Sequence, residues 1–165
     1  FAGVISKYVM VEVTRPELWS FCMRMDLAAG GVLWRPGQEG VGLVIVHKGA
    51  VGIFTSPPPR ESPEGSPGER PLAIYRHGWF LNIGALADGK PQHFAVATED
   101  AEVVIIQSLS LARLVRDHPV TNAAITRAVI RQQLVEEQMR HHSYVDRSKN
   151  VLSNNGRCTS VDPES

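Results

Sequence analysis

Residues 78–97, GWFLNIGALADGKPQHFAVA, decide the fold of this chain. Three bulky apolar residues follow the first glycine, and a second apolar run begins at Phe94 after two more glycines and a proline. The run from Phe94 has the composition of a short strand. A short helical turn that starts near Gly84 would leave backbone amides free at its start, which is a natural anion site. The stretch therefore predicts a tight turn followed by a strand.

Short apolar runs broken by glycines continue on both sides of this stretch. They are rich in β-branched residues, and tight turns are expected at Pro36-Gly37 and Lys48-Gly49. The predicted strands are residues 32–34, 41–47, 50–55, 72–76, 94–98 and 101–107. Residues 56–70, SPPPRESPEGSPGER, cannot bury enough apolar surface to offset their ordering entropy, so we expect a flexible loop between two strands. A docking motif for a proline-binding partner is the alternative for this loop.

Helices are predicted on both sides of the strands. Thr14 and Glu17 have the spacing of a capping box, and apolar residues then recur at helical spacing through Met23, which predicts a short helix that ends before Gly30. Residues 110–117 predict a second helix that stops before Pro119. Residues 121–141 predict a long third helix. We expect a lead at 1–13, one domain at 14–143 and a disordered, polar tail at 144–165.

The long third helix has a broad apolar face with two interpretations. It packs on the strands, or it forms a lid over a pocket or a homodimer contact, and periodicity alone does not name the partner surface. The candidate lid and interaction residues are Val129, Leu134, Val135 and Met139.

The composition fits one globular domain. The 165 residues are 43% hydrophobic and 21% charged, close to globular averages. The 17 basic residues balance 17 acidic ones, so the broad basic surface of a nucleic-acid-binding protein is not expected. Cys22 and Cys158 lie far apart, which predicts two free thiols and neither a disulfide framework nor a zinc cluster.

No targeting or membrane-spanning segment is apparent in the sequence. Apolar runs stay short of the length that crosses a bilayer, and no signal peptide pattern precedes the domain. We therefore expect a cytoplasmic location with no direct membrane insertion. The chain begins with Phe1 and not with Met, so we expect it to be an excised part of a larger protein.

Several motifs in order resemble the cyclic nucleotide-binding domain family, from Met23 to Met139. In that family a phosphate-binding cassette runs from a glycine and aromatic stretch into Phe-Gly-Glu-Leu-Ala-Leu and then Pro-Arg-x-Ala. Residues 78–97, called the cassette below, match it without a gap when aligned on Gly84-Ala85-Leu86, Gly89, Pro91 and Val96. Residues 29–33 and 36–40 resemble two glycine turns of the family, 43–51 its strand pair joined by a lysine-glycine hairpin, and 111–119 its helix ending near a proline. The resemblance implies a mainly β fold with flanking helices, a β-roll or jelly-roll of about eight strands.

Three cassette positions depart from the family's ligand chemistry. The resemblance places the cassette glycine at Asn82, the ribose-binding glutamate at Ile83 and the phosphate-binding arginine at Gln92. Ile83 cannot accept a hydrogen bond and Gln92 carries no charge, so the charge-assisted contacts to a cyclic phosphate would be missing. The nearby cations His93 and Arg76 do not occupy the matching position. We therefore expect no cofactor, cAMP and cGMP included.

The resemblance nevertheless implies a set of candidate pocket residues. They are Asn82, Ile83, Gly84, Ala85, Leu86, Gln92, His93 and Phe94. The aromatic and apolar residues Trp79, Phe80 and Leu81 would form an apolar contact beside them, or belong to the core.

Alternatives from other classes have weaker signals. A metal-dependent cupin-type enzyme would need a His-x-His pair with further ligands, whereas the histidines here are isolated or adjacent on a helix. A transcription regulator of the catabolite-activator type would need a helix-turn-helix, and the polar C-terminal sequence does not predict one.

A non-catalytic regulatory module is the expected function. The Gly78-Trp79-Phe80 stretch, the replaced arginine and the proline-rich insertion at 56–70 resemble divergent domains that occur as cytosolic parts of sulfate permease-like transporters. This resemblance suggests a place at the cytosolic face of a membrane protein. The expected partners are the rest of a larger polypeptide or another protein, with a homodimer through the C-terminal helix as an option. A functional cAMP- or cGMP-binding domain with an atypical pocket is the alternative.

Overall fold

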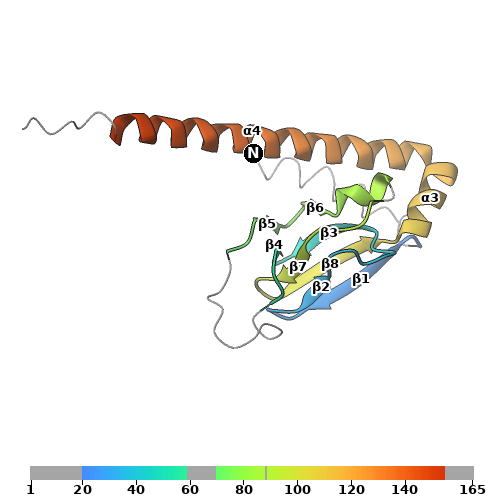
Figure 1. Cartoon of the computed structure of the whole chain (residues 1–165). Coiled ribbons are helices and arrows are strands. Elements are labelled where there is room, and N and C mark those ends of the chain that lie inside the picture. The colour runs from blue at the N-terminus through green and yellow to red at the C-terminus, as the bar shows by residue number, and fades with distance from the viewer. Residues whose placement is uncertain (1–19, 59–69, 88, 155–165) are drawn as a thin grey trace, which may run out of the picture. The chain divides into compact units, whose positions relative to one another are not determined.

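The computed structural model describes residues 20–58, 70–87 and 89–154, with side chains in the last helix described through His141. Eight strands, one 3₁₀ helix and two α-helices follow one another within these ranges (Figure 1). The strands are β1 Cys22–Leu27, β2 Val32–Trp34, β3 Leu43–Lys48, β4 Ala50–Phe54, β5 Ala73–Arg76, β6 Phe80–Leu81, β7 Phe94–Ala97 and β8 Ala101–Ile106. The helices are η1 Ile83–Ala87, α3 Ser108–Asp117 and α4 Pro119–Asn154.

The strands form two antiparallel sheets. Sheet A has the strand order β1-β8-β3-β6, and sheet B has the order β2-β7-β4-β5. Each sheet joins strands that are far apart in the sequence, because β8 lies between β1 and β3 while β7 lies between β2 and β4. This crossing between the sheets closes the strands into a β-roll.

Two hydrophobic cores form on the two faces of sheet A. Side chains alternate between faces along a strand, so Leu43 and Ile45 face one core while Val44 and Val46 face the other. The intersheet core holds Trp34, Val44, Val46, Val51, Leu81, Ala95, Ala97, Ala101, Val103 and Ile105. The helix-side core holds Leu43, Ile45, Phe80, Ala85, Val104, Ile106, Leu111, Leu114, Ile125 and Val129. Sheet A is thus the middle layer, with sheet B on one face and η1, α3 and the start of α4 on the other.

The chain divides into two compact units. The first is Phe1–Val129, which contains the β-roll, α3 and the first turns of α4, and the second is Ile130–Ser165. No helix in the described part of the chain combines the length and the apolar character needed to cross a membrane.

The predicted helix before Gly30 is wrong where the structure describes it. Cys22–Leu27 is a strand that pairs residue by residue with β8, from Cys22 opposite Ile106 to Leu27 opposite Ala101. This pairing supplies backbone hydrogen bonds and burial that outweigh the helical spacing of Cys22 and Met23. The capping residues Thr14 and Glu17 lie outside the described residues.

Two other boundaries also differ from the expectation. The turn at Gly49, with φ of 73°, is tight as predicted, but β3 and β4 lie in different sheets and do not pair as a hairpin. The last helix continues to Asn154, past the expected start of the tail at 144, because no proline or glycine interrupts the sequence after Pro119 until Gly156. Most of the predicted loop at 56–70 and the residues after Asn154 lie outside the described ranges.

Candidate functional site

The cassette backbone turns sharply after β6. Asn82 has φ of 54°, in the left-handed region, and its carbonyl accepts a hydrogen bond from the Ala85 amide at 2.9 Å, which starts η1. The Gly84 carbonyl then accepts from the Gly89 amide at 2.8 Å. A Cβ on Gly89 would lie 2.9 Å from the Gly84 oxygen, so this close approach favours glycine. The short helical turn predicted near Gly84 is confirmed as η1.

The Asn82 side chain is used within the protein. Its Nδ2 donates to the carbonyl oxygens of Val41 at 2.9 Å and Gly42 at 3.0 Å, at the start of β3. With φ of 54°, Asn82 has a left-handed backbone at the position that the resemblance gives to the cassette glycine. Asparagine tolerates that region better than most residues.

The apolar residues of η1 divide between core and surface. Ile83 is half-buried and packs against the helix-side core, and Ala85 is part of that core. Leu86 is 38% exposed, and Gly84 is exposed. At the position that the resemblance gives to a ribose-binding glutamate, the structure thus has an aliphatic side chain in contact with the core.

The segment around Gln92 is held by its own backbone and by the loop before β3. Gln92 is exposed, and its Nε2 donates to the Lys90 carbonyl at 3.2 Å. The Lys90 ammonium lies 2.6 Å from the Glu39 carboxylate, and this hydrogen bond and charge lower the pKa of Glu39. The Pro91 carbonyl accepts from the Gly37 amide at 2.7 Å. These contacts fix the end of the cassette to the turn at 37–39.

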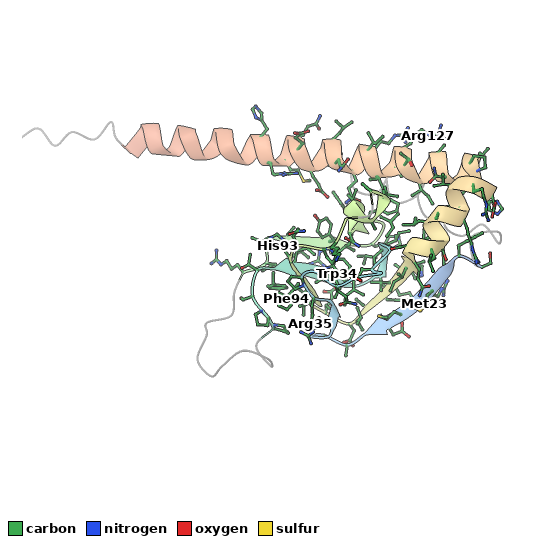
Figure 2. All side chains as sticks on the ribbon, turned by 45° about the vertical axis from the view of Figure 1, so that its right-hand side comes forward. Met23, Trp34, Arg35, His93, Phe94 and Arg127 are labelled. Carbon is green, nitrogen blue, oxygen red and sulfur yellow. The ribbon has the colours of Figure 1, made fainter. Side chains whose placement is uncertain are left out.

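The two other candidate pocket residues lie at the start of β7. His93 is half-buried, and its carbonyl accepts a hydrogen bond from Nε1 of the buried Trp34 at 3.1 Å. Phe94 pairs across the sheet with Phe54. Figure 2 labels Trp34, His93 and Phe94 in the same region of the β-roll. Arg76 at the end of β5 pairs with Glu99 in the turn between β7 and β8, at 3.5 Å, and not with a cassette residue.

The apolar residues before the cassette belong mainly to the cores. Phe80 is fully buried in the helix-side core and Leu81 in the intersheet core, so the two neighbours point to opposite faces of sheet A. Trp79 is half-buried, with its ring centroid 6.1 Å from that of Tyr75.

The candidate lid residues differ in their exposure. Val129 is 2% exposed and belongs to the helix-side core of the first unit. In the second unit, Leu134 and Met139 are 55% and 60% exposed, and Val135 is half-buried.

A polar cluster that the sequence analysis missed surrounds Glu102 on β8. A β-bulge in β3 places both His47 and Lys48 opposite Glu102, and Arg24 approaches from β1. The Glu102 carboxylate lies 3.3 Å from the Lys48 ammonium, 3.4 Å from the Arg24 guanidinium and 3.8 Å from Nε2 of His47. Burial would raise the pKa of this carboxyl, but the hydrogen bond of Lys48 and the nearby Lys48, His47 and Arg24 side chains together lower it. A single acidic residue within the apolar run AEVVII is the sequence signal that could have indicated the cluster.

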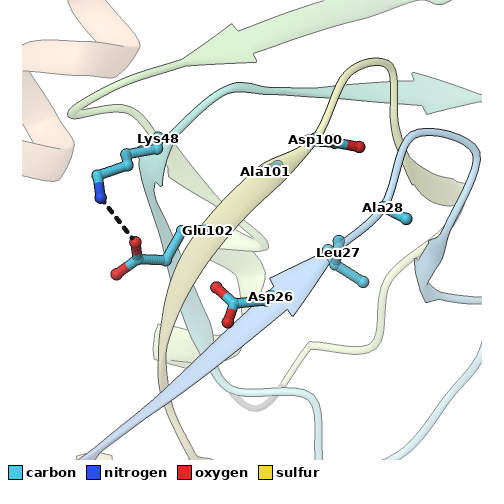
Figure 3. A pocket seen from close by; sticks show the side chains of 7 residues that line it. All are labelled: Asp26, Leu27, Ala28, Lys48, Asp100, Ala101 and Glu102. Atoms are coloured by element: carbon cyan, nitrogen blue, oxygen red, sulfur yellow. Dashed lines mark ion pairs between the residues drawn. The ribbon is translucent and has the colours of Figure 1, made fainter.

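An open pocket of about 420 Å³ lies beside this cluster (Figure 3). Figure 3 shows the ion pair between Lys48 and Glu102 at one side of the pocket and Asp100 at the other. The Asp100 carboxylate already accepts a hydrogen bond from the Ala29 amide at 2.9 Å. The lining residues are Asp26, Leu27, Ala28, Lys48, Asp100, Ala101 and Glu102. Among the described residues, no group of three or more histidine, cysteine or acidic side chains could hold a metal ion.

Solved structures resemble this fold, whereas no protein-family model and no curated protein matches the chain. A cyclic nucleotide-binding domain from Methylobacillus flagellatus superimposes with a TM-score of 0.61 at 17% identity, over 95% of this chain and 85% of that one. A putative cyclic nucleotide-binding protein from Geobacter metallireducens gives 0.59 at 15% identity, over 77% and 89%. The N-terminal domain of a transcriptional regulator from Streptomyces coelicolor gives 0.58 at 21% identity, over 83% and 94%. The predicted mainly β fold, a cyclic nucleotide-binding-like jelly-roll with flanking helices, is confirmed.

Proposed function

We propose that this chain is a non-catalytic regulatory or interaction module whose cassette does not use the usual cyclic nucleotide contacts. Ile83 carries the proposal. Its side chain is apolar and packs against the helix-side core at the position where the resemblance places a ribose-binding glutamate. A cyclic nucleotide in this position would leave its ribose hydroxyl without that acceptor, which costs binding free energy.

Two further residues support the proposal. The Gln92 amide donates to the Lys90 carbonyl and carries no charge, so it offers a phosphate neither the charge nor the two parallel donors of arginine. The Asn82 amide donates to Val41 and Gly42 and is therefore engaged within the protein. The side chains at the three substituted positions thus either make contacts within the fold or lie at the surface.

Calorimetric titration with cAMP and cGMP tests this proposal. We expect no binding by the unmodified chain up to millimolar nucleotide, and measurable binding by the Ile83→Glu/Gln92→Arg double variant. An Ile74→Glu/Gln133→Arg variant is the matched control, because it makes the same two exchanges at exposed positions outside the cassette and should not gain binding. Micromolar binding by the unmodified chain would overturn the proposal.

The alternative, a functional cAMP- or cGMP-binding domain with an atypical pocket, has one observation in its favour. The cassette frame is kept, with η1 and the Gly84–Gly89 hydrogen bond in place. The same titration decides between the two, since the alternative requires binding by the unmodified chain.

We place the module in a larger protein, such as a membrane transporter, at its cytosolic face. The support is the resemblance of the cassette to that of sulfate permease-like proteins and the similarity of the fold to a domain of a larger regulator. The full-length coding sequence tests this placement. Membrane-spanning segments in the same polypeptide would support it, and a helix-turn-helix would point instead to a transcription regulator.

The second unit offers the partner surface in this proposal. At about 100° per residue, Ile130 and Leu134 share one side of α4, and Val135 and Met139 share the opposite side. Ile130 and Leu134 are 49% and 55% exposed, so this side is available to a second copy or to another protein. Sedimentation of the unmodified chain and of Leu134→Glu tests for the homodimer, which the variant should weaken.

A further inference from the structure

Asn82 has a backbone conformation that is uncommon for residues other than glycine. Among the residues that the structure describes, it is the only one other than glycine with a positive φ, at 54°. Non-glycine residues persist in this region when other contacts hold them there. The contacts of Asn82 therefore show what holds its backbone in this conformation.

Asn82 joins two segments through separate groups. Its carbonyl oxygen accepts from the Ala85 amide and so starts η1. Its side chain contacts the Val41 and Gly42 carbonyls, which are acceptors only, so the two hydrogen bonds at 2.9 and 3.0 Å require the Asn82 NH₂ group as the donor. One residue thus begins the cassette turn and holds the start of β3.

Gly42 in turn lies directly against the start of α3. A Cβ placed on Gly42 would be 1.7 Å from the Ile106 carbonyl oxygen and 2.6 Å from the Gln107 Cα. Gln107 is the N-cap residue of α3, and its carbonyl accepts from the Leu111 amide at 2.9 Å. The main chain at Gly42 is therefore packed directly against the main chain of Ile106 and Gln107, where α3 begins.

We propose that Asn82 couples the cassette to the first turn of α3 through the main chain of Val41 and Gly42. A change of the backbone at Asn82 moves its amide group, and the two carbonyls bonded to it must then move or lose their donor. Gly42 cannot shift toward Ile106 without displacing the start of α3. Coupling of this kind travels through contiguous hydrogen bonds and packed main chain. The proposal goes beyond the function proposed above, because it holds whether or not the cassette binds a ligand.

Hydrogen exchange measured by mass spectrometry on an Asn82→Gly variant tests the coupling. Glycine adopts a positive φ without strain and removes the whole side chain with its amide group. We expect amide exchange to rise roughly tenfold both in η1 and in the first turns of α3, the size expected from losing one or two hydrogen bonds. Asn82→Asp, which presents an acceptor to the two carbonyls, should raise exchange in the same two segments by more.

Asp100→Ala is the matched control. It also removes a side-chain partner of a backbone group, the Ala29 amide, but in the turn between β7 and β8. We expect faster exchange near Ala29 and unchanged exchange in α3. The coupling is refuted if α3 exchange stays at the unmodified level in Asn82→Gly, or if it rises equally in Asp100→Ala.

Exchange in the unmodified chain at low denaturant gives a second test that needs no variant. Coupled segments open as one unit, so the Ala85 and Leu111 amides should show the same dependence on denaturant. Opening of the Ala85 amide while the Leu111 amide stays protected would also overturn the proposal.

Discussion

Replacing Gly49 by alanine should destabilise the chain far more than the same change at Gly40. Both glycines have φ of 73°, so both substitutions force alanine into the left-handed region. A Cβ on Gly49 would lie 2.1 Å from the Asp100 carbonyl oxygen and 2.8 Å from the Ala101 Cα, whereas a Cβ on Gly40 would meet no described atom within 4 Å beyond its own residue and its two chain neighbours. The pair therefore separates the conformational cost from the steric cost.

The magnitudes follow from these two terms. Left-handed alanine costs about 1–2 kcal/mol, which is the whole loss expected for Gly40→Ala. Forcing a methyl group into packed main chain adds about 1–3 kcal/mol, so Gly49→Ala should lose about 2–5 kcal/mol. Urea unfolding followed by tryptophan fluorescence at pH 7 measures both losses by linear extrapolation. Equal losses for the two variants would refute the close approach of the Gly49 turn to the β7–β8 turn.

Three further variants or reagents test other parts of the structure. Leu114→Ala removes a fully buried side chain and should lower the free energy of unfolding by about 2–5 kcal/mol. Leu109 is 82% exposed on the same helix, so Leu109→Ala should change that free energy by less than about 0.5 kcal/mol. Equal urea midpoints for the two variants would contradict the packing of α3. Because the pKa of Glu102 is lowered from 4.5, its ionised form adds stability that is present above about pH 4.5 and lost as the pH falls through the lowered pKa. The difference in stability between the unmodified chain and Glu102→Gln should therefore shrink between pH 7 and pH 3, and a constant difference would exclude the ion pairs as its source. Burial raises the pKa of Cys22 to about 11, so iodoacetamide at pH 8 should label its peptide at least about tenfold more slowly in the native chain than in urea, and equal rates would show an accessible thiolate.

The sequence predicts most strands because composition and turns agree locally. The runs that became β3, β4 and β8 are rich in β-branched residues and end at glycines or polar residues, and these signals require no knowledge of the partner strand. The strand β1 has no such signal. Its sequence CMRMDL has helical spacing and no β-branched residue, and only the pairing with β8 makes it a strand.

The site is less predictable than the fold, because its contacts join distant residues. The resemblance locates Asn82, Ile83 and Gln92, but the sequence does not show that the Asn82 amide bonds to carbonyls at residues 41 and 42. The cluster around Glu102 depends on a bulge that brings two consecutive residues of β3 to one carboxylate. A one-residue shift in register of this kind arises from the pairing of whole strands and leaves no local pattern.

The two-residue strand β6 has a consequence for how the β-roll unfolds. Phe80 and Leu81 are adjacent in the chain and are buried on opposite faces of sheet A, so one peptide unit belongs to both hydrophobic cores. If the β3–β6 pairing opens, water reaches the helix-side core and the intersheet core together. The layers of the β-roll should therefore melt in a single cooperative transition, in which helix loss and exposure of Trp34 share one midpoint.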